Sequence, residues 1–356
     1  MTTPTETLSE RPQRKKSPPP NLSTLPPKVL DVVMKSVDLK TVQSVRKVCF
    51  KLRSHVDGVT LDSKILKAFI FFASKDKISI ELKTKDDLFE VTYIQDGNNS
   101  IVDNGLKKTV ENMDIGTCVG NDMGLILINQ KSLVRKFGFM LSEQCRPLQE
   151  NFLRQLVEHL NTRKEKLRLK YFSWTGPIDQ DQILSVFETL NPMSLQKIDL
   201  TNGQHLAGQP TVAYDIQRIA NTEQWKRGKT VETLGFVAHV PFSCFYKFSN
   251  AHIMVDTITV EDLVALRKRA LKNPKFEEFY AVYINFPDEA DFINRFGKPY
   301  KSTKTGKTWY YKFPMNENAL TVDWTTQKTI SFGRILAKDF HKYSFTRDTL
   351  VQLDLD

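Results

Sequence analysis

The sequence has little of what disulfide-bonded, metal-binding or membrane-spanning proteins need. It contains four cysteines, Cys49, Cys118, Cys145 and Cys244, and no Cys-x-x-Cys pair, so we expect free thiols and neither disulfides nor a zinc site. No run of eighteen apolar residues exists, which argues against a membrane-spanning helix. The N-terminus lacks the apolar stretch of a secretory signal, so we expect a cytoplasmic or nuclear protein in a reducing compartment.

Motifs for catalysis are also missing. The six histidines never occur at His-x-His or His-Glu-x-x-His spacing, and there is no Gly-x-Ser-x-Gly or Gly-x-Gly-x-x-Gly. The string 305–308, Thr-Gly-Lys-Thr, resembles the end of a phosphate loop, but Lys301 stands where the leading glycine belongs and a strand-like WYYKF follows. His239 and Cys244 are near in sequence, and we interpret them as a core histidine and a buried thiol. We therefore predict no catalytic residues, no metal and no cofactor.

The chain carries more basic than acidic residues. The net charge is +10, with 51 basic against 41 acidic residues, which allows nucleic acid, acidic proteins or plain solubility as explanations. Residues 1–24 hold five prolines and almost no large apolar residue, so we predict a disordered tail. Within it, Arg14, Lys15 and Lys16 precede Ser17, a pattern that fits a nuclear-import signal, a phosphorylation site or a solvated tail without function.

Short helices follow from residue 25. Pro26 and Pro27 suit the first turn of a helix, Asp38 suits an N-cap, and Gly58 suits a helix end. Apolar residues recur at helical spacing in two runs, namely Val29, Leu30, Val33, Met34 and Val37, then Leu39, Val42, Val45, Val48, Cys49, Leu52 and Val56. About forty residues cannot enclose a full core alone, so we expect another domain or a partner to cover part of this apolar surface.

Strand-like patterns begin after residue 64. Residues 66–72, 77–82 and 88–94 alternate as three strands of a meander, which we expect to end at Asp96-Gly-Asn-Asn. Residues 124–128, Gly-Leu-Ile-Leu-Ile, are a further strand candidate.

From residue 146 helices and strands alternate. We predict helices at 147–161, 180–189, 214–225 and 261–272, and strands at 167–172 and 195–200. An apolar-x-x-apolar-x-apolar spacing recurs at Leu195, Ile198 and Leu200, at Val231, Leu234 and Phe236, and at Val255, Ile258 and Val260, with a blurred copy at Phe276 and Phe279. The intervals fit irregular leucine-rich-type repeats with an insertion at 203–210, or an ordinary βαβα sheet.

In the C-terminal part we predict a β-hairpin with strands at 292–300 and 308–313. Two further strands, at 319–324 and 330–333, could extend this hairpin. Its segment 295–312 interleaves basic and aromatic residues without an acid: Arg295, Phe296, Lys298, Tyr300, Lys301, Lys304, Lys307, Trp309, Tyr310, Tyr311 and Lys312. This texture fits single-stranded nucleic acid, and it also fits a solvated hairpin that packs its rings on one face.

Residues 25–57 resemble an F-box. The Leu-Pro opening, the Val-Asp-Leu junction, the Arg-Lys-Val-Cys string ending at Cys49 and the following Leu52-Arg53 are most similar to the nematode-expanded F-box A family, in which an FTH domain follows the box. The resemblance implies binding to a Skp-type adaptor and, through it, to a cullin. The implied adaptor-binding residues are Leu25, Pro26, Leu30, Val33, Met34, Leu39, Val42, Val45, Val48, Cys49 and Leu52. Lys28 departs from the acidic residue usual in the family.

The expected fold is α+β or α/β: a small helical F-box, then a strand meander leading into irregular leucine-rich-like β/α repeats. We expect a tail at 1–24, the box at 25–60, a β-rich part at 61–145 and an FTH-like domain with a C-terminal hairpin at 146–345. The predicted function is that of the substrate receptor of an SCF-type ubiquitin ligase, non-catalytic, monomeric within its complex and binding an unknown protein target. The alternatives are a repeat-type interaction module outside any ligase, a nucleic-acid-binding protein that uses 295–312, and an enzyme of unrecognised type.

Overall fold

The computed structural model describes residues 21–46, 48–58, 61–203, 212–286, 289–343 and 350–351. The expected tail up to residue 20, with its basic run, and nearly all of the expected insertion lie outside the described residues. The chain divides into two compact units, residues 1–62 and 63–356.

The first unit is helical. A 3₁₀ turn, Leu22–Thr24, precedes α1 (Pro27–Ser36), α2 (Leu39–Arg46) and α3 (Phe50–Gly58). Pro27 opens α1, and the Asp38 carboxylate accepts a 2.6 Å hydrogen bond from the Thr41 amide at the start of α2. The second apolar run is therefore two helices and not one. Leu22, which was expected in the tail, packs against the core of this unit.

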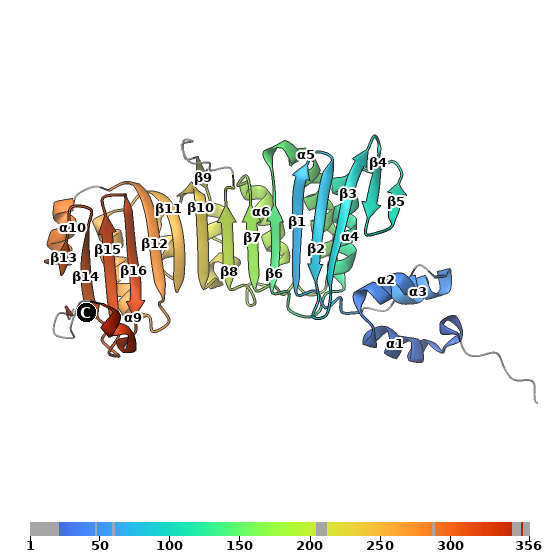
Figure 1. The fold of residues 1–356 in the computed structure, drawn as a ribbon, viewed down its shortest axis with the longest axis horizontal. Coiled ribbons are helices and arrows are strands. Elements are labelled where there is room, and N and C mark those ends of the chain that lie inside the picture. The colour runs from blue at the N-terminus through green and yellow to red at the C-terminus, as the bar shows by residue number, and fades with distance from the viewer. Residues whose placement is uncertain are drawn as a thin grey trace, which may run out of the picture. The chain divides into compact units, whose positions relative to one another are not determined.

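The second unit is built on one sixteen-stranded sheet (Figure 1). Its strands are β1 (Lys67–Ser74), β2 (Lys77–Lys83), β3 (Leu88–Asp96), β4 (Asn99–Asp103), β5 (Lys107–Val110), β6 (Lys136–Met140), β7 (Tyr171–Thr175), β8 (Lys197–Thr201), β9 (Ala213–Asp215), β10 (Thr230–His239), β11 (Asn250–Thr257), β12 (Glu278–Asn285), β13 (Lys301–Ser302), β14 (Gly306–Lys312), β15 (Ala319–Thr325) and β16 (Thr329–Ile335). The central strands, in the order β1-β6-β7-β8-β10-β11-β12, are parallel, and antiparallel strands continue the sheet on both sides.

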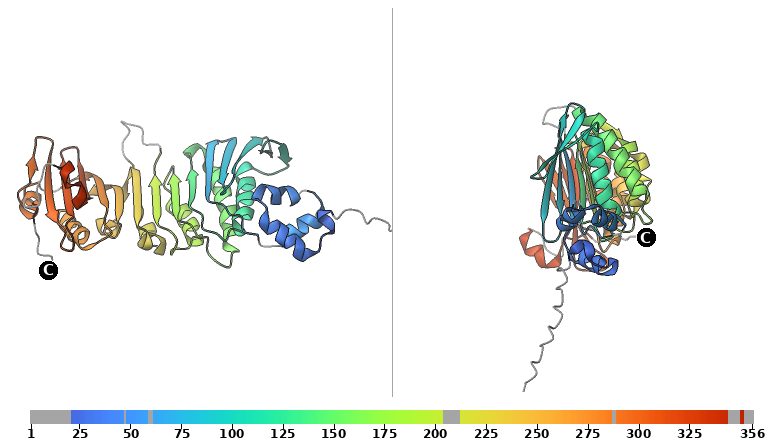
Figure 2. Two further views of the ribbon diagram at one scale, coloured as in Figure 1. Left: turned by 60° about the horizontal axis from the view of Figure 1, so that its bottom comes forward. Right: turned by 90° about the vertical axis from the view of Figure 1, so that its right-hand side faces the viewer.

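Helices cover one face of this sheet (Figure 2). They are α4 (Ile115–Ile128), α5 (Arg146–Asn161), α6 (Gln180–Thr189), α7 (Gln217–Ala220), α8 (Glu223–Arg227), α9 (Val260–Lys272) and α10 (Glu289–Phe296). Aromatic contacts join the two layers: Phe139 of β6 meets Phe152 of α5, and Phe172 of β7 meets Phe187 of α6. The opposite face of the parallel strands carries no helix among the described residues.

Two rows of buried residues run across the parallel strands on the helix-covered face. Strand pairing aligns Ala68, Phe137, Phe172, Ile198, Val231, Ala251 and Phe279 in one row, and Ile70, Phe139, Trp174, Leu200, Thr233, Ile253 and Ala281 in the other. Every member is at most 2% exposed. Because alternate strand residues face opposite sides, the residues between these rows lie on the open face.

The α/β alternation is confirmed, and α6 has the bounds predicted for it, whereas the expected repeat register is wrong. Val231 pairs with Ile198 and Ala251, and not with Leu195 or Val255. The third instance of the apolar spacing, Val255, Ile258 and Val260, extends beyond the end of β11. Ile258 therefore lies in a loop, and Val260 starts α9.

Five local predictions are also wrong. Residues 124–128 belong to helix α4, the meander continues through β4 and β5 beyond residue 99, and residues 292–296 belong to helix α10. The predicted strand 167–172 becomes two isolated bridges, at Leu167 and Leu169, followed by β7. The predicted helix 214–225 divides into β9 and the short helices α7 and α8.

Candidate functional site

The apolar residues of the first unit divide into a core and a surface. Leu30, Met34, Val42, Val45, Leu52 and Val56 are buried together, with Val33, Val37 and Cys49 partly buried against them. Of the other predicted adaptor-binding residues, Leu25 is half-buried, Pro26 and Val48 are exposed, and the burial of Leu39 is not described. Most of the predicted set therefore forms the core of the box itself, and its role in adaptor binding stays a prediction.

Two apolar residues of the box that are at least 67% exposed were not among the predicted site residues. Val32 is 67% exposed on α1, and Phe50 is 82% exposed at the start of α3. Each lies two positions from a buried residue, Val32 from Leu30 and Phe50 from Leu52, which places it away from the core-facing side of its helix. This two-residue offset from an apolar core position can be read from the sequence and could have identified both residues.

Phe50 borders a pocket within this unit. The pocket has a volume of about 370 Å³ and is lined by Leu25, Pro27, Leu30, Phe50, Lys51, Ser54 and His55. His55 Nε2 lies 2.9 Å from Asp31 Oδ1 and so ties α3 to α1. Lys51 donates a 2.6 Å hydrogen bond to the Ser23 carbonyl oxygen. The pocket and the apolar side chains around it form a candidate docking surface on the box.

The open face of the sheet carries a second candidate site, which is polar. Its centre is Tyr171 on β7, whose ring lies between two lysines from the neighbouring strands. Lys136 Nζ of β6 is 4.4 Å from the ring centroid, and Lys197 Nζ of β8 is 4.8 Å from it. Lys136 also lies over the ring of Phe69, at 4.7 Å. Such cation–π contacts hold the ammonium groups at fixed positions on the sheet.

Hydrogen bonds and an ion pair extend this network. The Tyr171 hydroxyl donates to Asp199 Oδ2 at 2.9 Å, and burial together with Asp199 raises the pKa of Tyr171. Lys197 forms a 2.7 Å ion pair with Glu232. Burial lowers the pKa of Lys136 from its ordinary value.

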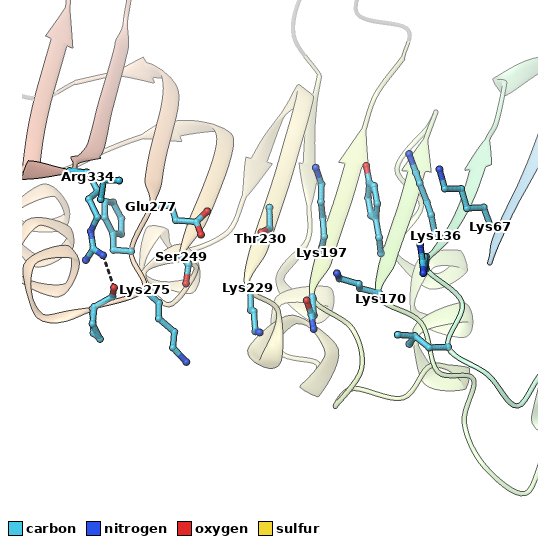
Figure 3. Close-up of a pocket in the computed structure, with 17 residues that line it drawn as sticks. Lys67, Lys136, Lys170, Lys197, Lys229, Thr230, Ser249, Lys275, Glu277 and Arg334 are labelled. Carbon is cyan, nitrogen blue, oxygen red and sulfur yellow. Dashed lines mark hydrogen bonds between the residues drawn. The ribbon is translucent and has the colours of Figure 1, made fainter. Parts of the chain in front are cut away.

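A groove runs along the open face at the start of the parallel strands (Figure 3). Its volume is about 1140 Å³. Of the residues that line it, eight are basic and one, Glu277, is acidic; the basic ones are Lys67, Arg135, Lys136, Lys170, Lys197, Lys229, Lys275 and Arg334. We call these eight residues the basic strip. Among the described residues, Lys197 is the one member of the strip with an ion-pair partner.

The basic and aromatic segment 295–312 is largely a packing element. Phe296, Trp309 and Tyr311 are at most 3% exposed. Arg295 pairs with Glu261 at 2.8 Å, and Lys307 pairs with Glu289 at 2.5 Å. The rings on which the nucleic-acid alternative depends for stacking are therefore mostly buried.

All four cysteines are free thiols, and burial raises the pKa of Cys118 to about 12. His239 is exposed at the end of β10, so the interpretation of it as a core histidine is wrong, and the Cys244 thiol is half-buried. In the described part of the chain, no group of His, Cys, Asp or Glu side chains is placed to hold a metal ion. No helix in that part is both long and apolar enough to cross a membrane.

Comparison with known proteins matches both units. Residues 22–64 match the F-box domain, and residues 150–299 match the FTH domain. The chain thus combines an F-box match with an FTH match, which supports an F-box protein of the adaptor type. It is 25% identical to F-box A protein 224 of Caenorhabditis elegans over 315 residues, which cover 85% of this chain and 77% of that protein. It therefore matches the nematode F-box A family, as the sequence predicted. No solved structure gives a significant match.

Proposed function

We propose that the chain is the substrate receptor of an SCF-type ubiquitin ligase. F-box domains generally bind Skp-type adaptors, and the adaptor would connect this chain to a cullin. The second unit would hold a protein target while other subunits transfer ubiquitin, so the chain itself needs no catalytic residues. This role would place it in the cytoplasm or nucleus. The observation that carries the proposal is the exposed apolar surface of the box at Phe50, beside a pocket in an otherwise filled helical unit.

The physical basis is the cost of leaving apolar surface in water. Val32, Val48 and Phe50 are each at least 67% exposed, although the box has a complete core of its own. Covering a side chain the size of phenylalanine contributes about 1.5–3 kcal/mol to binding. That energy corresponds to roughly a tenfold to hundredfold change in affinity.

The test is binding of the purified full chain to a purified Skp-type adaptor. Phe50→Asp should weaken binding at least tenfold, because the charge would have to lose its water in an apolar interface. Its melting temperature should stay close to that of the wild type, since the side chain is exposed. Met315→Asp is the matched control, because Met315 is also 82% exposed but lies in the other unit. Equal binding of the adaptor by Phe50→Asp and the wild type would show that the adaptor docks elsewhere on the chain. A wild-type chain that captures no adaptor would favour an interaction module outside any ligase.

A further inference from the structure

The basic strip is distinctive because its charges are gathered from strands far apart in the sequence. Lys67 is on β1, Lys170 precedes β7, Lys229 precedes β10 and Lys275 precedes β12. Figure 3 shows these side chains spaced along the start of the strands, with Lys136 and Lys197 among them and Ser249 between Lys229 and Lys275. Parallel pairing repeats the same edge position at each strand, so the basic residues at the starts of β1, β6, β7, β8, β10 and β12 line up in one row, which Ser249 interrupts at β11.

The strip is also poor in compensating charge outside its centre, where Glu232 pairs with Lys197 and Asp199 accepts from Tyr171. Lys67, Arg135, Lys170, Lys229 and Lys275 are all exposed, and no carboxylate within the described residues pairs with them. Glu277 is the acidic residue of the lining. Like charges held side by side repel one another, and an anion that spans them relieves this repulsion. The row therefore fits an elongated ligand with several negative charges.

The length of the row indicates what kind of anion fits. From β1 to β12 the row crosses six strand spacings of about 4.8 Å, or roughly 29 Å, which an extended peptide of about nine residues would span. Eight of the seventeen residues that line the groove are basic, whereas small-molecule pockets are lined mostly by hydrophobic and aromatic side chains.

The aromatic residues beside the basic strip favour a peptide over a nucleic acid as its ligand. Single-stranded nucleic acids bind where free ring faces stack on bases. Here β6 and β8 flank β7, so Lys136 and Lys197 approach the Tyr171 ring from its two sides. Lys136 also covers Phe69, and Phe276 is buried. The rings thus serve to position lysines, and their faces are occupied.

We infer that the basic strip binds an acidic, extended segment of a partner protein, of about nine residues, across the open face of the sheet. This inference rests on the proposed function insofar as that partner is the ligase target. Recognition of the acidic segment itself needs no adaptor.

The probe is a fluorescent decamer of glutamate, titrated with the full chain by anisotropy, with a decamer of serine and glycine and a ten-nucleotide oligothymidine as comparisons. The strip variant carries Lys67→Glu, Lys170→Glu and Lys229→Glu. The control variant carries Lys75→Glu, Lys268→Glu and Lys304→Glu, three exposed lysines outside the groove lining. Both variants have the same net charge, so they differ only in where the charge is reversed.

We expect the wild type and the control variant to bind the acidic decamer within about threefold of each other, and the strip variant to bind at least tenfold more weakly. Affinity should fall as salt rises, because the charges are exposed. Should the strip variant fail to fold, as judged by its melting temperature, Lys170→Gln with Lys229→Gln replaces it, with the same expected order.

Three results would overturn the inference: equal loss in the strip and control variants, no binding of the acidic decamer by the wild type at low salt, or oligothymidine binding tighter than the decamer and lost in the strip variant. The last result would assign the groove to nucleic acid. The strip variant should capture adaptor like the wild type. Failure of adaptor capture by every variant would instead count against the proposed function and leave the peptide result standing.

Discussion

A Cβ atom placed on Gly120 would lie 2.7 Å from the carbonyl oxygen of Phe152, so α4 and α5 pack there with no room for a side chain. Gly→Ala in a helix normally stabilises it by about 1 kcal/mol. Gly120→Ala should do the opposite and cost about 1–3 kcal/mol, because the methyl group forces the backbone of α5 away. Urea denaturation measures the difference. Leu125→Ala on the exposed side of α4 is the control and should change stability by less than about 0.5 kcal/mol. A stabilised Gly120→Ala would mean that the helices are not in this contact.

The same helix shows why part of the fold escaped prediction. Residues 124–128 are a short run of apolar and β-branched residues, which looks like a buried strand when it is taken alone. The glycines at 116, 120 and 124 are four residues apart and share one helix face, and Asp114 caps the helix by accepting a 3.0 Å hydrogen bond from the Thr117 amide. Both signals are in the sequence. They indicate a helix only when the packing of these glycines against α5, which comes later in the chain, is also known.

The candidate sites differ in how far the sequence could reveal them. The box, with its Asp38 cap and Pro27 start, was predicted from local signals. Phe50 was missed because the predicted set followed the periodic apolar residues, which turn out to fill the core. The basic strip could not be predicted, because its members lie between residues 67 and 334 and only strand register brings them together.

Two neighbouring residues of β8 should respond differently to truncation. Ile198 is fully buried in the first row under the helices, so Ile198→Ala should cost about 2–5 kcal/mol. Lys197 lies on the open face, where it pairs with Glu232 and contacts the Tyr171 ring. Lys197→Ala should therefore cost about 0.5–1 kcal/mol, more than a surface residue without contacts. Urea midpoints with matching m-values measure both. Equal midpoints for the two variants would contradict the assigned strand faces.

Tyr311→Phe tests whether the segment 295–312 serves packing. The Tyr311 hydroxyl donates a 2.7 Å hydrogen bond to the Phe296 carbonyl oxygen and accepts one from Arg267 at 3.2 Å. Removing the hydroxyl leaves buried polar groups without a partner, which should cost about 1–3 kcal/mol. Tyr280→Phe, at a half-buried ring whose hydroxyl has no hydrogen-bond partner among the described residues, should cost less than about 0.5 kcal/mol. Thermal or urea unfolding compares them, and equal costs would argue against a packing role for Tyr311.

Charges placed in the core of the box should unfold it. Leu30 and Met34 are 3% and 2% exposed, so Leu30→Asp with Met34→Asp should abolish the helical structure of residues 21–58 and, with it, adaptor binding. The second unit has its own core and should stay folded. Limited proteolysis should therefore cleave this variant within the box while leaving residues 63–356 resistant. Phe50→Asp should keep the box resistant. A protease-resistant box in the double variant would show that Leu30 and Met34 are not core residues.

Lys247 should make stability depend on pH. Burial lowers the pKa of its ammonium to about 7 in the folded chain, whereas an unfolded lysine titrates near about 10.4. Between these values the unfolded chain holds a proton that the folded chain has released, so the contribution of Lys247 to the free energy of unfolding rises with pH. Lys247→Met removes this titration. The stability of the wild type relative to Lys247→Met should therefore increase from pH 7 to pH 9, measured by urea denaturation at fixed ionic strength. Lys268→Met, on the exposed side of α9, is the control, and its difference from the wild type should stay constant. A constant difference for Lys247→Met as well would mean that this lysine stays protonated in the folded chain throughout that range.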